Sequence, residues 1–241
     1  MYKNYLFDLY GTLVDIRTDE ENGYLWEKLC TLYGFYGAYY TPPALKDAYQ
    51  KEVQAETQAT KAAYPQYTHI EVRLENVFFT LYKNRGVVAD RQLVDYTAQF
   101  FRAISTSHVR LYDGVLDLLD ALNNAGKKKY LLTNAQRCFT MPELTLLKIA
   151  DRFDGIVISS NEYTKKPDKA FYHIILKRYG LNPAESIMIG NDCTTDIKGA
   201  HDAGLDSLYI HSNLSPEITK PLPCTYRIMD GDVCQIKKLV L

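Results

Sequence analysis

The stretch YLFDLYGTL, residues 5–13, places an aspartate directly after a short apolar run. Tyr5 to Phe7 are β-forming residues and predict a buried strand, and Gly11 allows the tight turn that follows. Asp8 then stands at the carboxyl end of this strand, where polar residues of α/β proteins meet their ligands. A carboxylate here either caps the following turn or serves as a nucleophile that divides one displacement into two steps.

Three later apolar runs have the same form, and each also ends in polar residues. They are residues 130–132, 156–158 and 187–189. Runs of this length are typical of buried parallel strands. Segments with helical periodicity lie between or after them, at 115–125, 168–179 and 196–203, and a glycine follows each one. This alternation predicts an α/β fold with a Rossmann-like, doubly wound parallel sheet.

The segment from about residue 17 to residue 109 interrupts this pattern. It consists of long stretches with helical spacing, separated by proline- and glycine-containing breaks, and we expect four helices in it. Val72, Asn76 and Phe79, with Tyr82 or Lys83, predict one packing face. We expect a core of residues 1–16 and 110–241 and a helical cap of residues 17–109. The tail after residue 215 is expected to add an edge strand and a short helix.

Composition gives no reason to expect a polyanionic partner. Lys and Arg total 28 against 29 Asp and Glu, so neither nucleic acid nor an anionic membrane is favoured. The five cysteines are scattered without a CxxC pair, as in reducing compartments. The apolar run before Asp8 is too short for a signal peptide. We therefore expect a cytoplasmic protein with a small-molecule substrate; the sequence does not indicate its oligomeric state.

Two polar motifs could bind an anion. Thr133 and Asn134 end the second apolar run and offer a hydroxyl and an amide, although such residues also form ordinary loops. In the Lys-Pro-Asp motif at residues 166–168, Pro167 suits the first turn of a helix and directs Lys166 toward the helix amino end. Taken alone, a lysine is more often a solvated surface group.

The last motif, GNDCTTD at residues 190–196, could bind a cation. Asp192 and Asp196 lie four positions apart at a strand end, and Asn191 is adjacent. Mg²⁺ prefers oxygen ligands and takes one or two protein carboxylates, with water and substrate phosphate filling the remaining positions. The alternative is that Asp196 caps the following helix, and it could do both.

The order Asp8, Thr133, Lys166, then Asp192 and Asp196, resembles the haloacid dehalogenase-like (HAD) superfamily, in the group with a helical cap between the first and second motifs. The resemblance extends from residue 5 to about residue 210. It implies that Asp8 is the nucleophile and forms an aspartyl-phosphate, that Thr133 hydrogen-bonds the transferring group, and that Lys166 steadies its charge. Lys165 is the lesser candidate, because the family lysine directly precedes the proline.

The resemblance also implies a metal and a substrate. Mg²⁺ would be held by Asp8, the backbone carbonyl of Tyr10, and Asp192 or Asn191. Asp196 would orient Lys166 or support the metal shell, and Tyr10 and Asn134 are the expected substrate-binding residues. The activity favoured by these residues is that of a Mg²⁺-dependent phosphatase acting on a small phosphorylated metabolite.

Tyr10 departs from the phosphatase pattern. Phosphatases of this superfamily usually carry a second aspartate two residues after the nucleophile, which acts as general acid and then base. A tyrosine there resembles the 2-haloacid dehalogenases, which need no metal and whose halide leaves without a proton. The presence of Asp192 as well as Asp196 favours a phosphatase over a dehalogenase. A metal-independent dehalogenase and a slow or non-catalytic phosphate-ligand binder are the alternatives.

Overall fold

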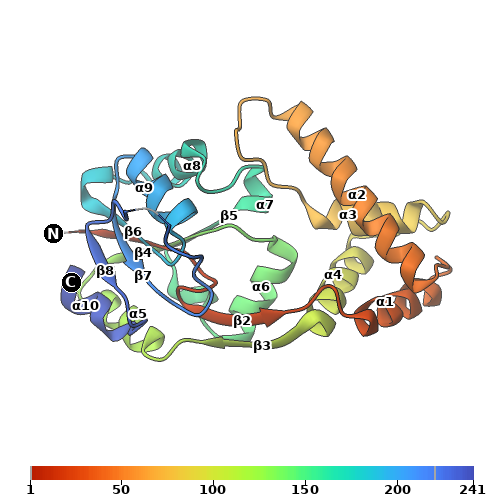
Figure 1. The fold of residues 1–241 in the computed structure, drawn as a ribbon, viewed down its shortest axis with the longest axis horizontal. Coiled ribbons are helices and arrows are strands. Elements are labelled where there is room, and N and C mark those ends of the chain that lie inside the picture. Colours follow the sequence, from red (N-terminus) through yellow and green to blue (C-terminus); the bar gives the residue numbers. More distant parts are fainter. Residues whose placement is uncertain (1, 220) are drawn as a thin grey trace.

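The computed structural model describes residues 2–219 and 221–241, and within them six strands form one parallel sheet (Figure 1). The strands, in their order across the sheet, are β5 (Gly155–Ile158), β4 (Lys128–Thr133), β1 (Asn4–Phe7), β6 (Ser186–Gly190), β7 (Asp206–Ile210) and β8 (Tyr226–Ile228). From β1 the chain builds first toward β4 and β5, then returns to the other side for β6, β7 and β8. This reversal creates a crevice beyond the end of β1, where such folds bind ligands.

Both faces of the sheet are covered, which explains the continuous apolar runs in its strands. Tyr5 and Phe7 of β1 face one buried cluster, to which α5 (Val115–Asn124) and α10 (Cys234–Val240) contribute. Leu6 faces a second cluster on the opposite side. That cluster includes residues of α8 (Lys169–Tyr179) and α9 (Lys198–Asp202). The predicted doubly wound core, its edge strand and its terminal helix are confirmed.

Two predicted helices begin differently from the sequence expectation. Pro167 lies outside α8, because the carboxylate of Asp168 accepts the Ala170 N–H and serves as the N-cap. The expected helix at 196–203 is divided into a π-helical turn (Cys193–Ile197) and the short α9. The remaining short elements of the core are α6 (Arg137–Leu146), α7 (Ser159–Glu162) and 3₁₀ turns at Ala150–Arg152 and Pro183–Glu185.

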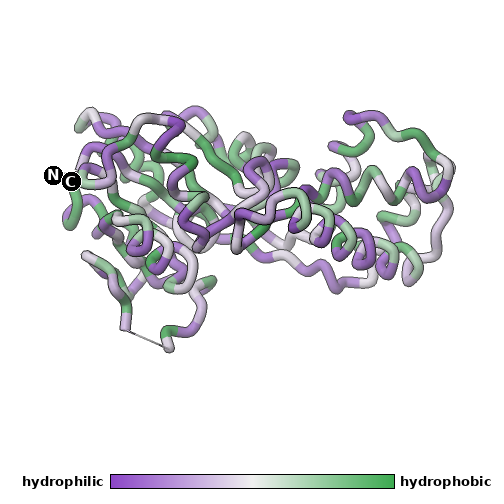
Figure 2. Tube along the Cα trace, turned by 90° about the horizontal axis from the view of Figure 1, so that it is seen from above, coloured by the Kyte–Doolittle hydropathy of each residue, from purple (hydrophilic) through white to green (hydrophobic). Residues whose placement is uncertain are grey.

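Residues 19–105, all of which the structure describes, contain the four expected helices, and Figure 2 shows this lobe extending away from the sheet lobe and from both termini. The helices are α1 (Gly23–Phe35), α2 (Pro42–Ala63), α3 (Leu74–Lys83) and α4 (Arg91–Ser105). They enclose an apolar core of their own. The predicted face of α3 is confirmed only in part. Val72 and Tyr82 are buried as expected, but Asn76 and Phe79 are exposed, and Val77, Phe78 and Leu81 pack toward α2 and α4 instead.

An antiparallel ribbon joins the two lobes, and the sequence did not reveal it. It consists of β2 (Val14–Thr18) and β3 (Thr106–Leu111), so the expected division at residues 16/17 and 109/110 falls inside the ribbon. The buried carboxylate of Asp15 accepts hydrogen bonds from Arg110 at 2.9 and 2.8 Å and from Asn213 at 2.9 Å. The Arg110 bonds join β3 to β2 within the ribbon, and the Asn213 bond fastens the ribbon to the sheet lobe. Within the described ranges, no helix is both long and apolar enough to cross a membrane.

Asp15→Asn should show a pH-dependent loss of stability. The hydrogen bond from Asn213, with those from Arg110 and His108, lowers the pKa of Asp15 to about 2. Because this value lies below the ordinary 3.8, the ionised group stabilises the fold fully above about pH 4, and its contribution falls as the pH approaches 2. Arg110 is mostly exposed, so we expect a cost of only about 1 kcal/mol at neutral pH.

Urea unfolding of both proteins at pH 7, 5 and 3 measures this effect. The difference between wild type and variant should be equal at pH 7 and pH 5 and about half as large at pH 3. A difference that stays constant down to pH 3 would contradict the role assigned to Asp15.

Candidate active site

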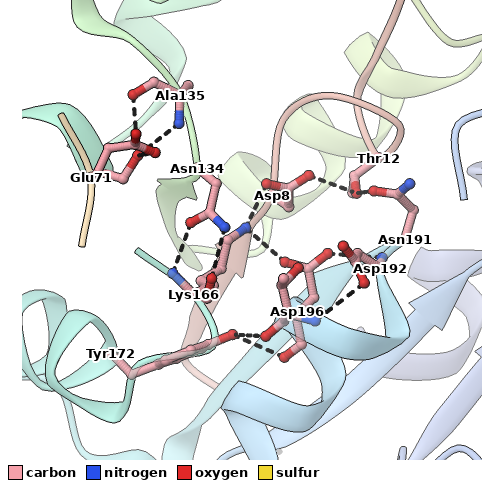
Figure 3. Close-up of polar contacts among 12 residues, drawn as sticks. Asp8, Thr12, Glu71, Asn134, Ala135, Lys166, Tyr172, Asn191, Asp192 and Asp196 are labelled. Atoms are coloured by element: carbon pink, nitrogen blue, oxygen red, sulfur yellow. Dashed lines mark hydrogen bonds and ion pairs between the residues drawn. The ribbon is translucent and has the colours of Figure 1, made fainter. Parts of the chain in front are cut away.

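Lys166 lies between two carboxylates at the carboxyl end of the sheet (Figure 3). Its Nζ donates to Asp8 Oδ1 at 2.6 Å and to Asp196 Oδ1 at 2.7 Å, and its side chain is 1 % exposed. Burial alone would lower the pKa of Lys166, but the two carboxylates raise it. Three motifs far apart in sequence are thus brought together as predicted, and the lysine is a buried cation rather than a surface group.

Asp196 is held by the backbone around it and does not cap a helix. The Asp192 N–H donates to Asp196 Oδ2 at 3.0 Å, and the Tyr172 hydroxyl donates to the Asp196 carbonyl at 3.0 Å. Burial, opposed by Lys166 and supported by the charge of Asp8, raises the pKa of the Asp196 carboxyl. The capping alternative for Asp196 is wrong, because the N-cap of the π-helical turn is Asp192.

Asn191 and Asp192 point to different partners. Asp192 Oδ1 accepts from the Thr194 N–H at 2.7 Å and from the Thr195 N–H at 3.2 Å, so its carboxylate is engaged within its own turn. Asn191 is buried, and its Oδ1 accepts from Thr12 Oγ1 at 3.2 Å. Thr12 Oγ1 also lies 3.5 Å from Asp8 Oδ2. Of the two candidate metal ligands, Asn191 is therefore the one linked to the nucleophile.

Thr133 and Asn134 have distinct environments. Thr133 is fully buried, and its Oγ1 has no hydrogen-bond partner among the described residues. A buried hydroxyl without a hydrogen-bond partner lowers the stability of the fold unless a ligand supplies the partner. Asn134 Nδ2 donates to the Lys166 carbonyl at 2.9 Å, and the Lys166 N–H donates to Asn134 Oδ1 at 2.8 Å. Asn134 was expected to bind substrate, yet its amide here holds the main chain of Lys166.

The Tyr10 hydroxyl is hydrogen-bonded to α6 of the sheet lobe, beside α4 of the helical lobe. It donates to Glu143 Oε2 and lies 3.2 Å from Thr140 Oγ1. Arg102 of α4 contacts Glu143 Oε1 at 2.6 Å and lies over the Tyr10 ring, 5.7 Å from its centroid. Burial and the charge of Glu143 raise the pKa of the Tyr10 phenol far above its ordinary value. Its side chain is therefore a structural link and a poor proton donor.

A cavity of about 180 Å³ opens beside Asp8. It is lined by Asp8, Tyr10, Asn134, Lys166, Asn191, Asp192, Thr195, Asp196 and Leu214. A larger apolar cavity of about 460 Å³ lies between α4 and α6 and contains no predicted site residue. In residues 2–219 and 221–241, no group of three or more His, Cys, Asp or Glu residues is arranged to hold a metal ion.

Oxygen atoms are nevertheless concentrated in the smaller cavity. The Asp8 carboxylate and the Asn191 amide are joined through Thr12, and Tyr10 follows two residues after Asp8. One carboxylate with neutral oxygens suits Mg²⁺, which completes its coordination with water and substrate. Sequence reasoning missed Thr12 and Tyr172; Thr12 lies within the opening motif, whereas nothing in the sequence linked Tyr172 to Asp196.

These features define an α/β protein with a helical insertion and a buried Asp–Lys–Asp site at the carboxyl end of its parallel sheet. The family model for haloacid dehalogenase-like hydrolases matches residues 2–204, and the chain belongs to this family. It is 27 % identical over 233 residues to the pyrimidine 5'-nucleotidase PynA of Streptococcus pneumoniae, covering 94 % of this chain and 91 % of the relative. It is 24 % identical over 220 residues to human N-acylneuraminate-9-phosphatase, covering 90 % and 86 %.

The fold also matches solved structures. A 2-haloacid dehalogenase from Pseudomonas syringae pv. tomato superposes with a TM-score of 0.68 at 18 % identity, covering 99 % of this chain and 97 % of the other. At this identity the match establishes a shared fold alone. The predicted family is thus confirmed, and the named sequence relatives are phosphatases.

Gly190→Ala should disrupt the site through a steric contact. A Cβ at Gly190 would lie 2.2 to 2.5 Å from side-chain atoms of Asp196, which would have to move from the position in which it binds Lys166. We expect unfolding to become easier by roughly 1–3 kcal/mol. We expect kcat to fall by roughly 100-fold, as for other misplaced catalytic groups.

Gly23→Ala is the matched control, because a Cβ there meets no atom within 4 Å. Thermal unfolding and turnover of both variants would be compared with the wild type. Wild-type turnover in Gly190→Ala would show that the position of Asp196 does not matter.

Proposed function

We propose that this hydrolase is a Mg²⁺-dependent phosphatase that acts on small phosphorylated metabolites through an aspartyl-phosphate. The observation that carries the proposal is the buried Asp8–Lys166–Asp196 arrangement. Thr133 ends the neighbouring strand β4, and its buried hydroxyl has no partner among the described residues, although it does not line the cavity. A buried, fixed cation suits a group that brings its own negative charge. The named relatives, a nucleotidase and a sugar-acid phosphatase, support the same class of reaction.

The first step is displacement at phosphorus by Asp8. Its Oδ1 is bound to Lys166, so Oδ2, with only a long contact to Thr12, is the attacking oxygen. A bond forms between Oδ2 and phosphorus while the bond to the leaving oxygen breaks. Lys166 and Thr133 stabilise the charge on the transferring phosphoryl group. The leaving oxygen takes its proton from solvent. Water then attacks phosphorus, the bond between Oδ2 and phosphorus breaks, the proton lost by the water passes to solvent, and phosphate is released with Asp8 restored.

Mg²⁺ fits the oxygen atoms of the cavity. Asp8, the Tyr10 carbonyl and the Asn191 amide would hold it, and it would neutralise charge on the phosphoryl oxygens. Asp192 and Asp196 were also considered as ligands, but the first is bound within its turn and the second to Lys166. Asp192 and Asp196 would contribute to the shape and charge of the site around the metal.

The helical lobe, residues 17–109, would act as the cap. Its position beside the site would exclude water from the first step and select the leaving group. The cytoplasmic location stays a prediction from the cysteines, all five of which are free thiols in the described chain.

The dehalogenase alternative is favoured by one observation, the tyrosine at position 10. It predicts chloride release from a short 2-chloro acid without any metal. Failure to release chloride from several such acids, in either enantiomer, would remove it. A non-catalytic binder would instead be stabilised by phosphate without turnover.

Phosphate release from an aryl phosphate and from alkyl phosphates, with Mg²⁺ and with chelator, tests the proposal. We expect Mg²⁺-dependent turnover that is absent in Asp8→Asn. Because Tyr10 does not supply a proton, the aryl ester should be favoured by roughly 10²–10⁴ over alkyl esters, the usual value of general acid catalysis. Turnover that is undiminished by chelator would contradict the metal, and turnover in Asp8→Asn would contradict the nucleophile.

Tyr10→Phe separates a structural tyrosine from a catalytic one. The variant should keep the wild-type ratio of aryl to alkyl turnover, because the phenol takes no part in protonating the leaving group. Its free energy of unfolding should fall by about 1 kcal/mol, since Glu143 loses a buried hydrogen bond. Tyr24→Phe, at an exposed site on α1, is the control for both measurements. A selective loss of alkyl turnover in Tyr10→Phe would identify the phenol as the acid.

A further inference from the structure

The loop between α2 and α3, residues 64–73, pairs with the core segment that carries Lys166. The Glu71 N–H donates to the Tyr163 carbonyl at 3.1 Å, and the Lys165 N–H donates to the His69 carbonyl at 3.0 Å. Between these bonds, Ile70 and Thr164 form an antiparallel bridge. The helical lobe thus contacts the core far from the ribbon, at the residue next to the catalytic lysine.

Asp168 fastens the other end of this pairing. Its Oδ2 accepts from the Thr68 N–H at 2.7 Å, from Thr68 Oγ1 at 3.0 Å and from the His69 N–H at 3.2 Å. Its Oδ1 accepts from the Ala170 N–H and caps α8. Burial alone would raise the pKa of Asp168, but the N–H groups of Ala170, His69 and Thr68 lower it. One ionised carboxylate therefore binds the α2–α3 loop and fixes the start of α8.

Charged side chains extend the contact beyond the backbone pairing. Arg73 Nε donates to the Ser160 carbonyl at 2.9 Å, and its guanidinium lies 4.6 Å from the centroid of the Tyr163 ring. Glu71 Oε2 accepts from Ser159 Oγ at 3.3 Å and lies 3.6 Å from Lys165 Nζ. Figure 3 shows Glu71 on the same side of Lys166 as Asn134.

A second set of hydrogen bonds joins the loop and the start of α3 to Gln136, which follows Asn134 and Ala135 in the chain. Gln136 Nε2 donates to the Val72 carbonyl at 3.0 Å, and Gln136 Oε1 accepts from the Leu74 N–H at 3.0 Å. The main chain of Lys166 is itself held by Asn134. The α2–α3 loop therefore contacts both the motif that carries Lys166 and the motif that supports it.

We propose that the α2–α3 loop is a positioning element for Lys166, with Thr68 and Asp168 as its positioning residues. The Lys166 ammonium must stay within hydrogen-bond distance of Asp8 and Asp196 while a phosphoryl group is transferred. A displacement of the Lys166 main chain would move the ammonium away from these carboxylates. The loop limits that displacement from one side and Asn134 limits it from the other. The proposal rests on the phosphatase function proposed above.

Thr68→Val tests the role, since it removes the hydroxyl bond to Asp168 while keeping the side-chain shape. We expect kcat to fall roughly fivefold, the usual effect of one hydrogen bond. The affinity for inorganic phosphate, measured by calorimetric titration, should weaken by a similar factor. Thr68→Ser should restore both, because it retains the hydroxyl. Thr57→Val, which removes a hydroxyl bonded within α2, is the matched control and should behave as wild type.

Two outcomes would overturn different claims. A Thr68→Val protein that melts at a lower temperature but keeps wild-type kcat and phosphate affinity would show that the loop is only a structural contact. A wild-type protein that binds inorganic phosphate but hydrolyses no phosphate ester would overturn the proposed phosphatase. In that case the phosphate titration of the Thr68 variants would still decide the positioning role.

Discussion

The ion pair that the structure depends on is the buried ammonium of Lys166 between the carboxylates of Asp8 and Asp196. Removing three charged groups from water is costly, and replacing such a group by apolar side chains often stabilises a protein. The arrangement is therefore better explained by its chemistry than by stability. It also constrains the fold, because the segments that follow β1, β5 and β6 must bring Asp8, Lys166 and Asp196 into contact.

The surroundings of this ion pair consist mostly of groups that hold the backbone. Gly190 lets Asp196 approach β6 more closely than any side chain would allow, and Tyr172 binds the carbonyls of Thr195 and Asp196. Asn134 binds the main chain of Lys166 on both its N–H and its carbonyl. A reaction that depends on placement and charge, as phosphoryl transfer does, needs rigid support of this kind.

Sequence reasoning succeeded where the information is local or follows from the topology of parallel strands. Tyr5 to Phe7 predicted a strand, and a parallel sheet then placed Asp8 and the residues after β6 at one edge, whereas the position of Lys166 beside them was implied only by the family resemblance. It failed where a long-range contact decides the outcome. Glu143 and Arg102 hold the Tyr10 side chain, and Thr12 and the hydrogen bonds of one turn give Asn191 and Asp192 different partners. The packing face of α3 was missed in part for the same reason, since it depends on the positions of α2 and α4.

The three attachments of the helical lobe explain why a tyrosine can occupy position 10. The ribbon β2–β3 continues directly from the first motif, and the α2–α3 loop pairs beside Lys166. Through Arg102 and Glu143, Tyr10 makes the third attachment, from α4 to the turn after the nucleophile. An aspartate at position 10 is too short to make the same contact while facing the substrate. Position 10, where phosphatases of this superfamily usually carry an aspartate, therefore holds here a side chain that joins the helical lobe to the turn after β1.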